Sequence, residues 1–280
     1  MFFMRLAWLA VVTWLFLLIR AEATETAPKR VVSMNLCTDQ LAMLLAAPGQ
    51  LYSVSYLAGR ADASVLAERA ADFVTNQGLA EEIFLMKPDL IIAGTFTTRA
   101  TVNLLKRLKF RVVEFSPANS FKDIEANVSR MGELLGRPTA AAAAVAEMRR
   151  ELATWSAAEK SRALTALYYA NSYTSGGNTL ASEIVRRAGL ENLGDKLGLK
   201  GTSRLPLELL VTGRPELLVK GRRHGSSGSR STAVLEHPAL IAATTRSERV
   251  LLSDRYWICG APFTLQAVRN LARAARQVVH

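Results

Sequence analysis

Short apolar runs alternate with segments of helical spacing in the first third of the chain. Arg30–Met34 and Leu51–Val54 are apolar runs of strand length. Between them, leucines recur on one helical face, at Leu41, Leu44 and Leu45. The same pattern predicts strands at Leu90–Ala93 and Arg111–Phe115, with a helix at Ala100–Leu108 between them. Alternation of this kind is typical of a parallel sheet covered by helices.

Residues 120 to 160 show helical spacing alone. Apolar side chains recur at Ile124, Val128, Met131 and Leu135, and then at Val145, Met148, Leu152 and Trp155. Gly136-Arg137-Pro138 separates the two segments, and proline is well suited to the first turn of a helix. The second helix is expected over Pro138–Lys160, where it would extend for roughly 33 Å. A helix of that length can connect two lobes.

In the last third of the chain, expected strands again alternate with expected helices. Strands are expected at Ala163–Ala170, Glu216–Lys220 and Arg249–Leu252, and helices at Thr179–Ala188, Leu207–Thr212, Pro238–Ala243 and Thr264–Val279. We therefore expect an α/β protein with lobes at residues 24–119 and 161–280, joined by connecting helices at 120–160. Ligands of open α/β sheets bind beyond the carboxyl ends of the strands, which predicts a ligand cleft between the lobes.

The first 23 residues have the pattern of a secretory signal. Arg5 is followed by the apolar run Leu6–Ile19 and then by Ala21-Glu22-Ala23, which is typical of a cleavable signal peptide. The run is shorter than the roughly 20 residues that cross a bilayer, so a permanent anchor is the less favoured alternative. We expect an exported protein, which is periplasmic in a Gram-negative bacterium.

Composition narrows the class of protein further. Half of the 280 residues are hydrophobic and 21% are charged, which excludes an intrinsically disordered chain. The formal net charge is +11, but the basic residues are scattered, so no nucleic-acid partner is expected. Three histidines stand at unrelated positions and neither cysteine belongs to a Cys-x-x-Cys pair. No metal site and no resident cofactor are therefore expected.

Five stretches of sequence, taken in order, carry a family resemblance. They are Arg30–Asn35, Glu82–Ala93, Arg187–Asn192, Leu207–Leu210 ahead of Arg214-Pro215-Glu216, and His237–Leu240. From about Lys29 to its end, the chain resembles the periplasmic substrate-binding proteins of ABC importers, in the group that carries ferric siderophores, haem and cobalamin. The resemblance implies two Rossmann-like lobes joined by one long backbone helix. It also implies a monomeric carrier, not an enzyme, that delivers a metal chelate to a two-subunit permease with its ATPase.

Several aromatic and basic residues follow the expected strands and are candidates for the cleft wall. They are Tyr56, Phe96, Arg99, Tyr173, Arg255, Tyr256 and Trp257, and Arg222, Arg223, His224 and Arg230 could add a basic rim. Aromatic walls with a few arginines suit a large planar chelate that carries negative charge. The alternative is that some of them are core or surface residues. Cobalamin binders of the family tend to have aromatic residues in the loops that correspond to Asn76 and Gly94, which favours a ferric siderophore or haem here.

One glutamate precedes the corresponding segment of each lobe. Glu81 lies before Lys87-Pro88-Asp89, and Glu208 lies before Arg214-Pro215-Glu216. The resemblance implies that these two glutamates dock on arginines of the two permease subunits. The alternative is local, because acidic residues in the first turn of a helix are favoured by its dipole.

The two cysteines leave three interpretations open. Cys37 follows the first strand and Cys259 follows the last one, so both are expected to face the cleft. They could be unrelated thiols, a disulfide across the cleft, or soft contacts to the bound chelate. A cross-cleft bond would hinder release of the ligand, so free thiols near the ligand are favoured.

Two other functions are compatible with a two-lobed scaffold. An exported enzyme is disfavoured because the chain contains no Gly-x-Ser-x-Gly, His-Glu-x-x-His or Gly-x-x-x-x-Gly-Lys motif. A sensor that binds a chelate and docks on a receptor has the same sequence features as a carrier, so this alternative stays open.

Overall fold

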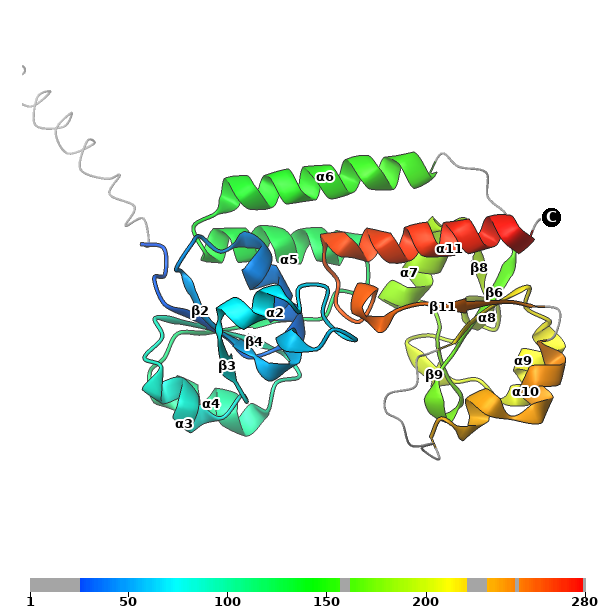
Figure 1. Ribbon diagram of the computed structural model, residues 1–280, viewed down its shortest axis with the longest axis horizontal. Helices are drawn as coiled ribbons and strands as arrows, with labels where there is room; N and C mark the ends of the chain where they lie inside the picture. The colour runs from blue at the N-terminus through cyan, green and yellow to red at the C-terminus, as the bar shows by residue number, and fades with distance from the viewer. Residues whose placement is uncertain (1–25, 157–161, 221–230, 245–246, 279–280) are drawn as a thin grey trace, which may run out of the picture.

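The first lobe is built on a five-stranded sheet with strand order β3-β2-β1-β4-β5. The computed structural model describes residues 26–156, 162–220, 231–244 and 247–278, and two lobes lie side by side in it (Figure 1). The strands are β1 (Val31–Ser33), β2 (Leu51–Ser55), β3 (Val74–Asn76), β4 (Leu90–Gly94) and β5 (Val112–Phe115). The helices are α2 (Leu36–Leu45), α3 (Ala80–Leu85) and α4 (Arg99–Arg107), with 3-10 turns η1 (Tyr56–Gly59) and η2 (Arg69–Asp72).

The strands of this sheet pair in parallel, as the alternating pattern predicts. Both faces of the sheet are covered, so β1 and β4 are continuous apolar runs in which Val31, Val32 and Ile91 are fully buried. Helix α2 begins directly after β1 because the side chain of Asn35 caps it, accepting a hydrogen bond from the Cys37 backbone N–H at 3.0 Å.

The second lobe contains a four-stranded parallel sheet with strand order β11-β10-β6-β8. Its strands are β6 (Leu164–Tyr168), β8 (Glu191–Asn192), β10 (Leu217–Lys220) and β11 (Glu248–Leu251). A separate antiparallel pair is formed by β7 (Tyr173–Ser175) and β9 (Thr202–Arg204). The helices are α7 (Leu180–Arg187), α8 (Leu193–Lys196), α9 (Leu207–Gly213) and α10 (Pro238–Ala243), with 3-10 turns η3 (Ala170–Ser172), η4 (Ala233–Glu236), η5 (Asp254–Tyr256) and η6 (Pro262–Thr264).

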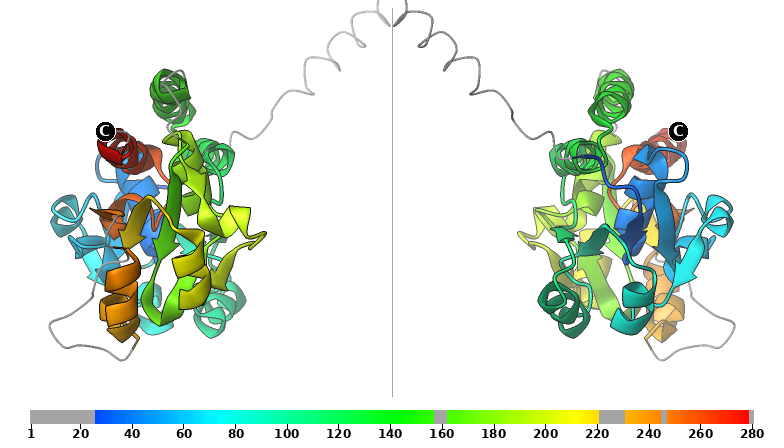
Figure 2. Two further views of the ribbon diagram at one scale, coloured as in Figure 1. Left: turned by 90° about the vertical axis from the view of Figure 1, so that its right-hand side faces the viewer. Right: turned by 90° about the vertical axis from the view of Figure 1, so that its left-hand side faces the viewer.

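Three long helices lie along one side of both lobes, namely α5 (Phe121–Leu134), α6 (Pro138–Ser156) and α11 (Leu265–Val278) (Figures 1 and 2). Helix α6 leads from the first lobe to the second, as predicted. Its 19 residues extend for about 28 Å, and residues 157–161 of the predicted helix lie outside the described part of the chain. Within that part, no helix combines the length and apolar character needed to cross a membrane.

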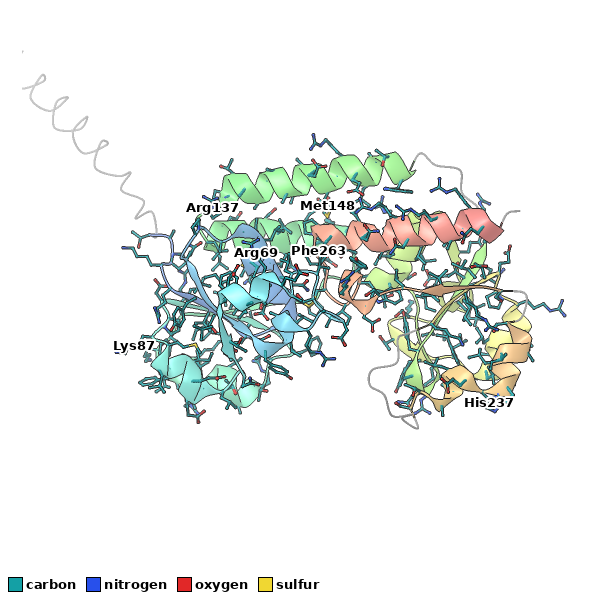
Figure 3. The ribbon with its side chains drawn as sticks, in the orientation of Figure 1. Arg69, Lys87, Arg137, Met148, His237 and Phe263 are labelled. Carbon is teal, nitrogen blue, oxygen red and sulfur yellow. A yellow bond between two sulfur atoms is a disulfide. The ribbon has the colours of Figure 1, made fainter. Side chains whose placement is uncertain are left out.

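One hydrophobic core continues from the first lobe to the second beneath α6. It contains Val31 and Ile124 of the first part of the chain and Leu167 and Leu271 of the second. Met148 joins it from the underside of α6, where Figure 3 shows its side chain. Packed interiors resist deformation, so a shared core favours small movements between the lobes. We therefore expect little closure when a ligand binds, and scattering curves recorded with and without ligand should nearly coincide.

The contact between α5 and α6 depends on a glycine. A Cβ atom on Gly132 would lie 2.3 Å from the Cβ of Ala141, so the two helices approach more closely there than a side chain permits. Gly132→Val is expected to lower the free energy of unfolding by about 1–3 kcal/mol. The matched control is Gly59→Val, because a Cβ at Gly59 has no neighbour within 4 Å. Equal denaturation midpoints for the two variants would contradict this packing.

Candidate functional site

A disulfide marks where the carboxyl ends of the two sheets meet. Cys37 lies in the first turn of α2, just beyond β1, and Cys259 follows β11 and η5. The two residues are bonded, with their Cα atoms 5.0 Å apart. The carboxyl ends of the two sheets are therefore directed toward each other across the space between the lobes, which the ribbon also shows (Figure 1).

The expectation of free thiols near the ligand is therefore wrong: no cysteine of the described chain is free. It rested on the idea that a bond would obstruct the cleft. The bond is instead part of a packed contact, because Cys259 is 1% exposed and packs with Leu36 and Ala63. The chain after it also passes tightly against the first lobe, since a Cβ on Gly260 would lie 2.5 Å from the Cβ of Ala118. A bond at this position joins α2 of the first lobe to the segment that follows η5.

A hollow of about 170 Å³ opens beside the disulfide. The carboxyl ends of β1, β4 and β5 form most of its wall, and residues of α2, of α5 and of the segment on both sides of Cys259 form the rest. It is lined by Asn35, Cys37, Thr38, Leu41, Gly94, Thr95, Phe96, Phe115, Ser116, Pro117, Ala118, Asn127, Ile258 and Gly260. Ligand pockets usually measure about 300–1,000 Å³, so a ligand of ordinary size would extend beyond this hollow.

Two of the predicted wall residues, Cys37 and Phe96, line the hollow. Sequence reasoning missed Asn35, Asn127 and Ile258, which also line it. The cap motif after β1 was a usable signal for Asn35, because an asparagine that caps a helix beyond a strand lies at the ligand-binding edge. Asn127 and Ile258 lie in segments that are distant in sequence from Asn35. Local sequence patterns give no information about which distant segments meet at the hollow.

Aromatic side chains stand at the carboxyl ends of strands in both lobes. Phe96 follows β4 and is 86% exposed, and Tyr56 follows β2 and is 49% exposed. In the second lobe, Tyr173 follows β6 and is 36% exposed. Trp257 is different, because it is only 8% exposed and packs edge-on against Tyr169 with ring centroids 5.9 Å apart. The first three rings thus have free surface for a ligand, whereas Trp257 lies largely in the core.

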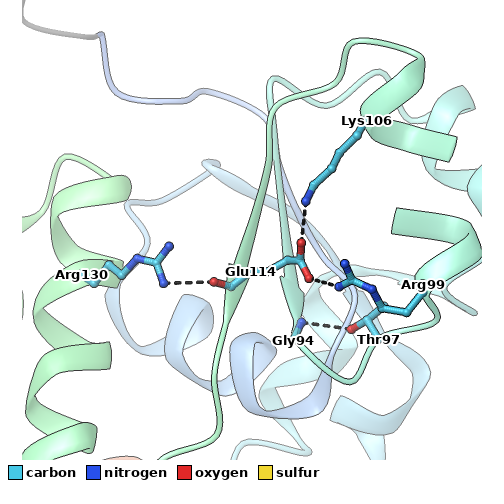
Figure 4. Close-up of polar contacts among 6 residues, drawn as sticks. All are labelled: Gly94, Thr97, Arg99, Lys106, Glu114 and Arg130. Carbon is cyan, nitrogen blue, oxygen red and sulfur yellow. Dashed lines mark hydrogen bonds and ion pairs between the residues drawn. The ribbon is translucent and has the colours of Figure 1, made fainter. Parts of the chain in front are cut away.

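The arginine at the start of α4 is held in an ion-pair network. Arg99 and Lys106 both pair with the carboxylate of Glu114 on β5, and Arg130 donates to the Glu114 carbonyl at 3.0 Å (Figure 4). The hydrogen bond from Lys106 is the largest of the effects that lower the pKa of Glu114. Glu114 therefore stays ionised and compensates the charge of Arg99.

Basic residues of the second lobe have other partners. Arg255 donates a hydrogen bond to the Tyr256 hydroxyl at 2.8 Å, and both side chains are partly exposed after β11. Arg222, Arg223, His224 and Arg230 lie outside the described residues. Groups of three or more histidine, cysteine or acidic side chains that could hold a metal ion do not occur among the residues that the structure describes.

A buried carboxyl group, that of Asp39, is hydrogen-bonded to the last residue of β2. Asp39 of α2 is completely buried and accepts a hydrogen bond from Ser55 Oγ at 2.5 Å, while its Oδ1 has no partner. Ser55 is the last residue of β2 and immediately precedes Tyr56. Burial raises the pKa of Asp39 from 3.8 to about 6, against the smaller opposing effect of the Ser55 hydroxyl.

This shift predicts a pH-dependent stability effect of Asp39→Asn. A carboxyl group whose pKa is raised on folding binds its proton more tightly in the folded state, so wild-type stability falls as pH rises from about 4 to about 6. Asparagine does not titrate. The stability of the variant relative to wild type should therefore be about 2–3 kcal/mol more favourable at pH 8 than at pH 4. Urea denaturation at both pH values tests this, and a difference that does not change with pH would contradict it.

The two glutamates expected to dock on a partner are both exposed, one on each lobe. Glu81 lies on α3 and Glu208 on α9, which are well separated in Figure 1. The capping bonds of α3 are made by Glu82, which accepts from the Gln77 and Leu79 backbone N–H groups. Glu81 is therefore not needed as a cap, and Leu85 beside it is 75% exposed.

Comparison with known proteins agrees with this architecture. The family model described as "Periplasmic binding protein" matches residues 31–255. A cobalamin-binding protein of Halobacterium salinarum is 24% identical over 230 residues, which is 80% of this chain and 62% of that relative, so the chain spans less than two thirds of its length.

Two solved structures share the two-lobed fold. The periplasmic heme-binding protein RhuT from Roseiflexus sp. RS-1 superposes with a TM-score of 0.73 at 19% identity, covering 90% of this chain and 99% of that one. For the periplasmic vitamin B12 binding protein BtuF of Vibrio cholerae the TM-score is 0.66 at 16% identity, with coverages of 90% and 98%. At these identities the likeness shows the fold.

Proposed function

The chain belongs to the periplasmic binding protein family, and we propose that it captures a metal chelate between its lobes and delivers it to an ATP-driven membrane permease. The observation that carries this proposal is the placement of the exposed rings. Phe96 and Tyr56 of the first lobe and Tyr173 of the second lie at strand ends that are directed toward one another. Exposed aromatic rings offer flat, apolar surface on which a macrocycle or an aromatic chelator stacks.

The chemistry of the hollow suits a bulky chelate whose metal ion stays coordinated by the chelator. The hollow is lined by apolar groups such as Phe96 and Ile258 and by neutral polar groups such as Asn35 and Asn127. Pockets of this kind orient a ligand with a few polar contacts on mostly apolar walls. A protein that contributes no cluster of metal-binding side chains to this wall would hold the chelate as a whole.

Three chelate classes follow from the relatives and from sequence, namely haem, corrinoids and ferric siderophores. The loop after β3 has no aromatic residue, and Asn76, the last residue of β3, is buried and donates to Ser33 and Ser53. This supports haem or a ferric siderophore over a corrinoid. Phe96, two residues beyond Gly94, supplies one aromatic face in the neighbouring loop, so a corrinoid remains the third member of the panel.

Delivery to a permease completes the proposed function. We propose that residues 1–23 direct export and are removed, and that the mature protein acts as a monomer in the periplasm. Glu81 and Glu208, one on each lobe, dock on the two permease subunits. Enzymatic activity is not part of the proposal, because the described residues that line the hollow include no histidine and no carboxylate.

Tryptophan fluorescence tests ligand capture. The mature protein is titrated with haemin, cyanocobalamin and a panel of ferric siderophores. Trp257 packs on Tyr169 close to the site, so one chelate should quench its emission with a saturable curve. Trp257→Phe should remove most of the quenching, whereas Trp155→Phe on α6 should keep it. Absence of saturable quenching and of calorimetric binding with every chelate would contradict the proposal.

A further inference from the structure

The disulfide lies where three segments of the chain meet. Cys259 packs with Leu36 of α2 and with Ala63, and Cys37 and Leu57 pack against the same cluster. These residues come from the first turn of α2, from the chain between β2 and β3, and from the segment that follows β11. The bond therefore fixes the point at which the segment after β11 meets the first lobe.

The residues on both sides of Cys259 belong to the wall of the hollow. Ile258 and Gly260 line it, and every other residue of that lining lies between positions 35 and 127. Ile258 is 49% exposed, so much of its side chain is free to contact a ligand. The part of the hollow wall that comes from the last third of the chain thus depends on where this short segment is held.

The hydrogen bonds of the segment around Cys259 are local. The Ile258 backbone N–H donates to the Asp254 carbonyl at 2.9 Å, and the Thr264 hydroxyl donates to the Cys259 carbonyl at 3.2 Å. These bonds shape the segment but do not attach it to the first lobe. Among the described contacts, attachment comes from the disulfide and from apolar packing.

The two sulfur-bearing residues differ in how a reagent can reach them. Cys37 is half-buried and lines the hollow, whereas Cys259 is 1% exposed. A thiol therefore approaches the bond from the Cys37 side, through the hollow. A ligand that occupies the hollow covers this route.

We propose that the disulfide positions Ile258 as a fixed wall of the hollow, so that chelate affinity depends on the redox state of Cys37 and Cys259. The inference rests on the proposed function and adds a redox control to its site. In the oxidised protein the wall is in place before the ligand arrives, and a preorganised site avoids the entropic cost of ordering. In the reduced protein the ligand has to order the segment, which lowers its affinity.

A dithiol accomplishes the change of state. Its thiolate attacks the Cys37 sulfur, and the Cys259 sulfur leaves as a thiolate that takes up a proton. The second thiol of the reagent then attacks the mixed disulfide, which releases Cys37 as a thiol and closes the reagent into a cyclic disulfide. The protein disulfide gains the two electrons that the dithiol loses.

Reciprocity between the two equilibria follows from this coupling. If reduction weakens chelate binding by a given factor, bound chelate must make reduction less favourable by the same factor. Coverage of Cys37 by the ligand also slows the attack itself. The proposal can therefore be tested from the ligand side and from the thiol side.

The affinity test compares the mature wild type with the Cys37→Ser/Cys259→Ser variant at a temperature where both are folded. The probes are gallium protoporphyrin IX, gallium-loaded siderophores and cyanocobalamin. The variant should bind the recognised chelate about tenfold more weakly. Gly132→Val is the control for lowered stability, because Gly132 contacts Ala141 and does not line the hollow, and it should bind within about twofold of wild type.

A double-mutant cycle with Ile258→Ala separates positioning from general destabilisation. In the oxidised wild type, Ile258→Ala should weaken binding about fivefold. In the variant without the disulfide, the same change should have less than about a twofold effect, because the side chain is no longer held in the wall. Equal effects in both backgrounds would overturn the inference.

The thiol test needs no variant. Wild type is treated with dithiothreitol, and alkylated Cys37 and Cys259 are counted by mass spectrometry over time. A saturating probe chelate should slow reduction about tenfold or more. Equal reduction rates with and without bound chelate, or equal affinities of wild type and the serine variant, would overturn the inference and leave the proposed function standing. If none of the probe chelates binds, the proposed function fails and this inference fails with it.

Discussion

Replacing Cys37 and Cys259 together by serine is expected to lower the free energy of unfolding by about 2–5 kcal/mol. The disulfide joins residues that are 222 positions apart, so it closes a very long loop of the unfolded chain, and long loops give a large entropic stabilisation. It also connects α2 of the first lobe to the segment that returns from β11 toward α11. Without the bond, contact between the lobes depends on the shared core and on polar contacts such as the hydrogen bond from Phe121 N–H to Glu183.

Denaturation with and without a reductant measures this effect. The oxidised wild type should unfold at a higher denaturant concentration than the Cys37→Ser/Cys259→Ser variant, and reductant should bring the wild type to the same midpoint. The variant itself should be insensitive to reductant, which makes it the control for other effects of the reagent. Two accessible thiols in the oxidised wild type, or identical midpoints for both proteins, would contradict the assignment of the bond.

The combined change Glu81→Ala and Glu208→Ala is expected to abolish transport while chelate affinity stays within about twofold. Both carboxylates are exposed, one on each lobe, and neither belongs to the lining of the hollow. Docking through both lobes at once makes the two contacts cooperate, because the second forms at a high effective concentration. Loss of both should therefore reduce transport much more than loss of either one.

Uptake of radiolabelled chelate in cells that carry the matching permease measures this prediction. A matched control removes two other exposed carboxylates, Glu133 on α5 and Glu248 on β11, and should transport normally. The control variant changes the net charge by the same amount. Loss of transport in the Glu81→Ala/Glu208→Ala variant alone would therefore identify these two glutamates as docking sites. Normal transport by the Glu81→Ala/Glu208→Ala variant would show that the permease does not recognise these glutamates.

Sequence predicted the elements with strong periodicity and missed those that depend on pairing. Helix α6 and the buried strands β1, β4 and β10 have apolar patterns of their own, and each is found close to its predicted position. Strands β3 and β9 were not predicted. They contain three residues each, and polar sequences such as Thr202-Ser203-Arg204 become strands only because a neighbouring strand is present.

Features of the site also differ in whether the sequence predicts them. Phe96, Tyr56 and Tyr173 follow strands at the carboxyl edge of each sheet, as the sequence predicts, and their contact with a ligand stays a prediction. The disulfide was one of three open interpretations, and sequence could not select it because the distance between Cys37 and Cys259 is set by the packing of the segment after β11 against the first lobe.

The most direct test of capture between the lobes is the position of the chelated metal in crystals of the complex. Anomalous diffraction at the iron or cobalt edge locates it without reference to the protein chain. We predict one peak between the lobes, beside the hollow at Asn35 and Phe96, with Tyr173 on the opposite side. A peak on the outer surface, or none in crystals grown at saturating chelate, would contradict the account.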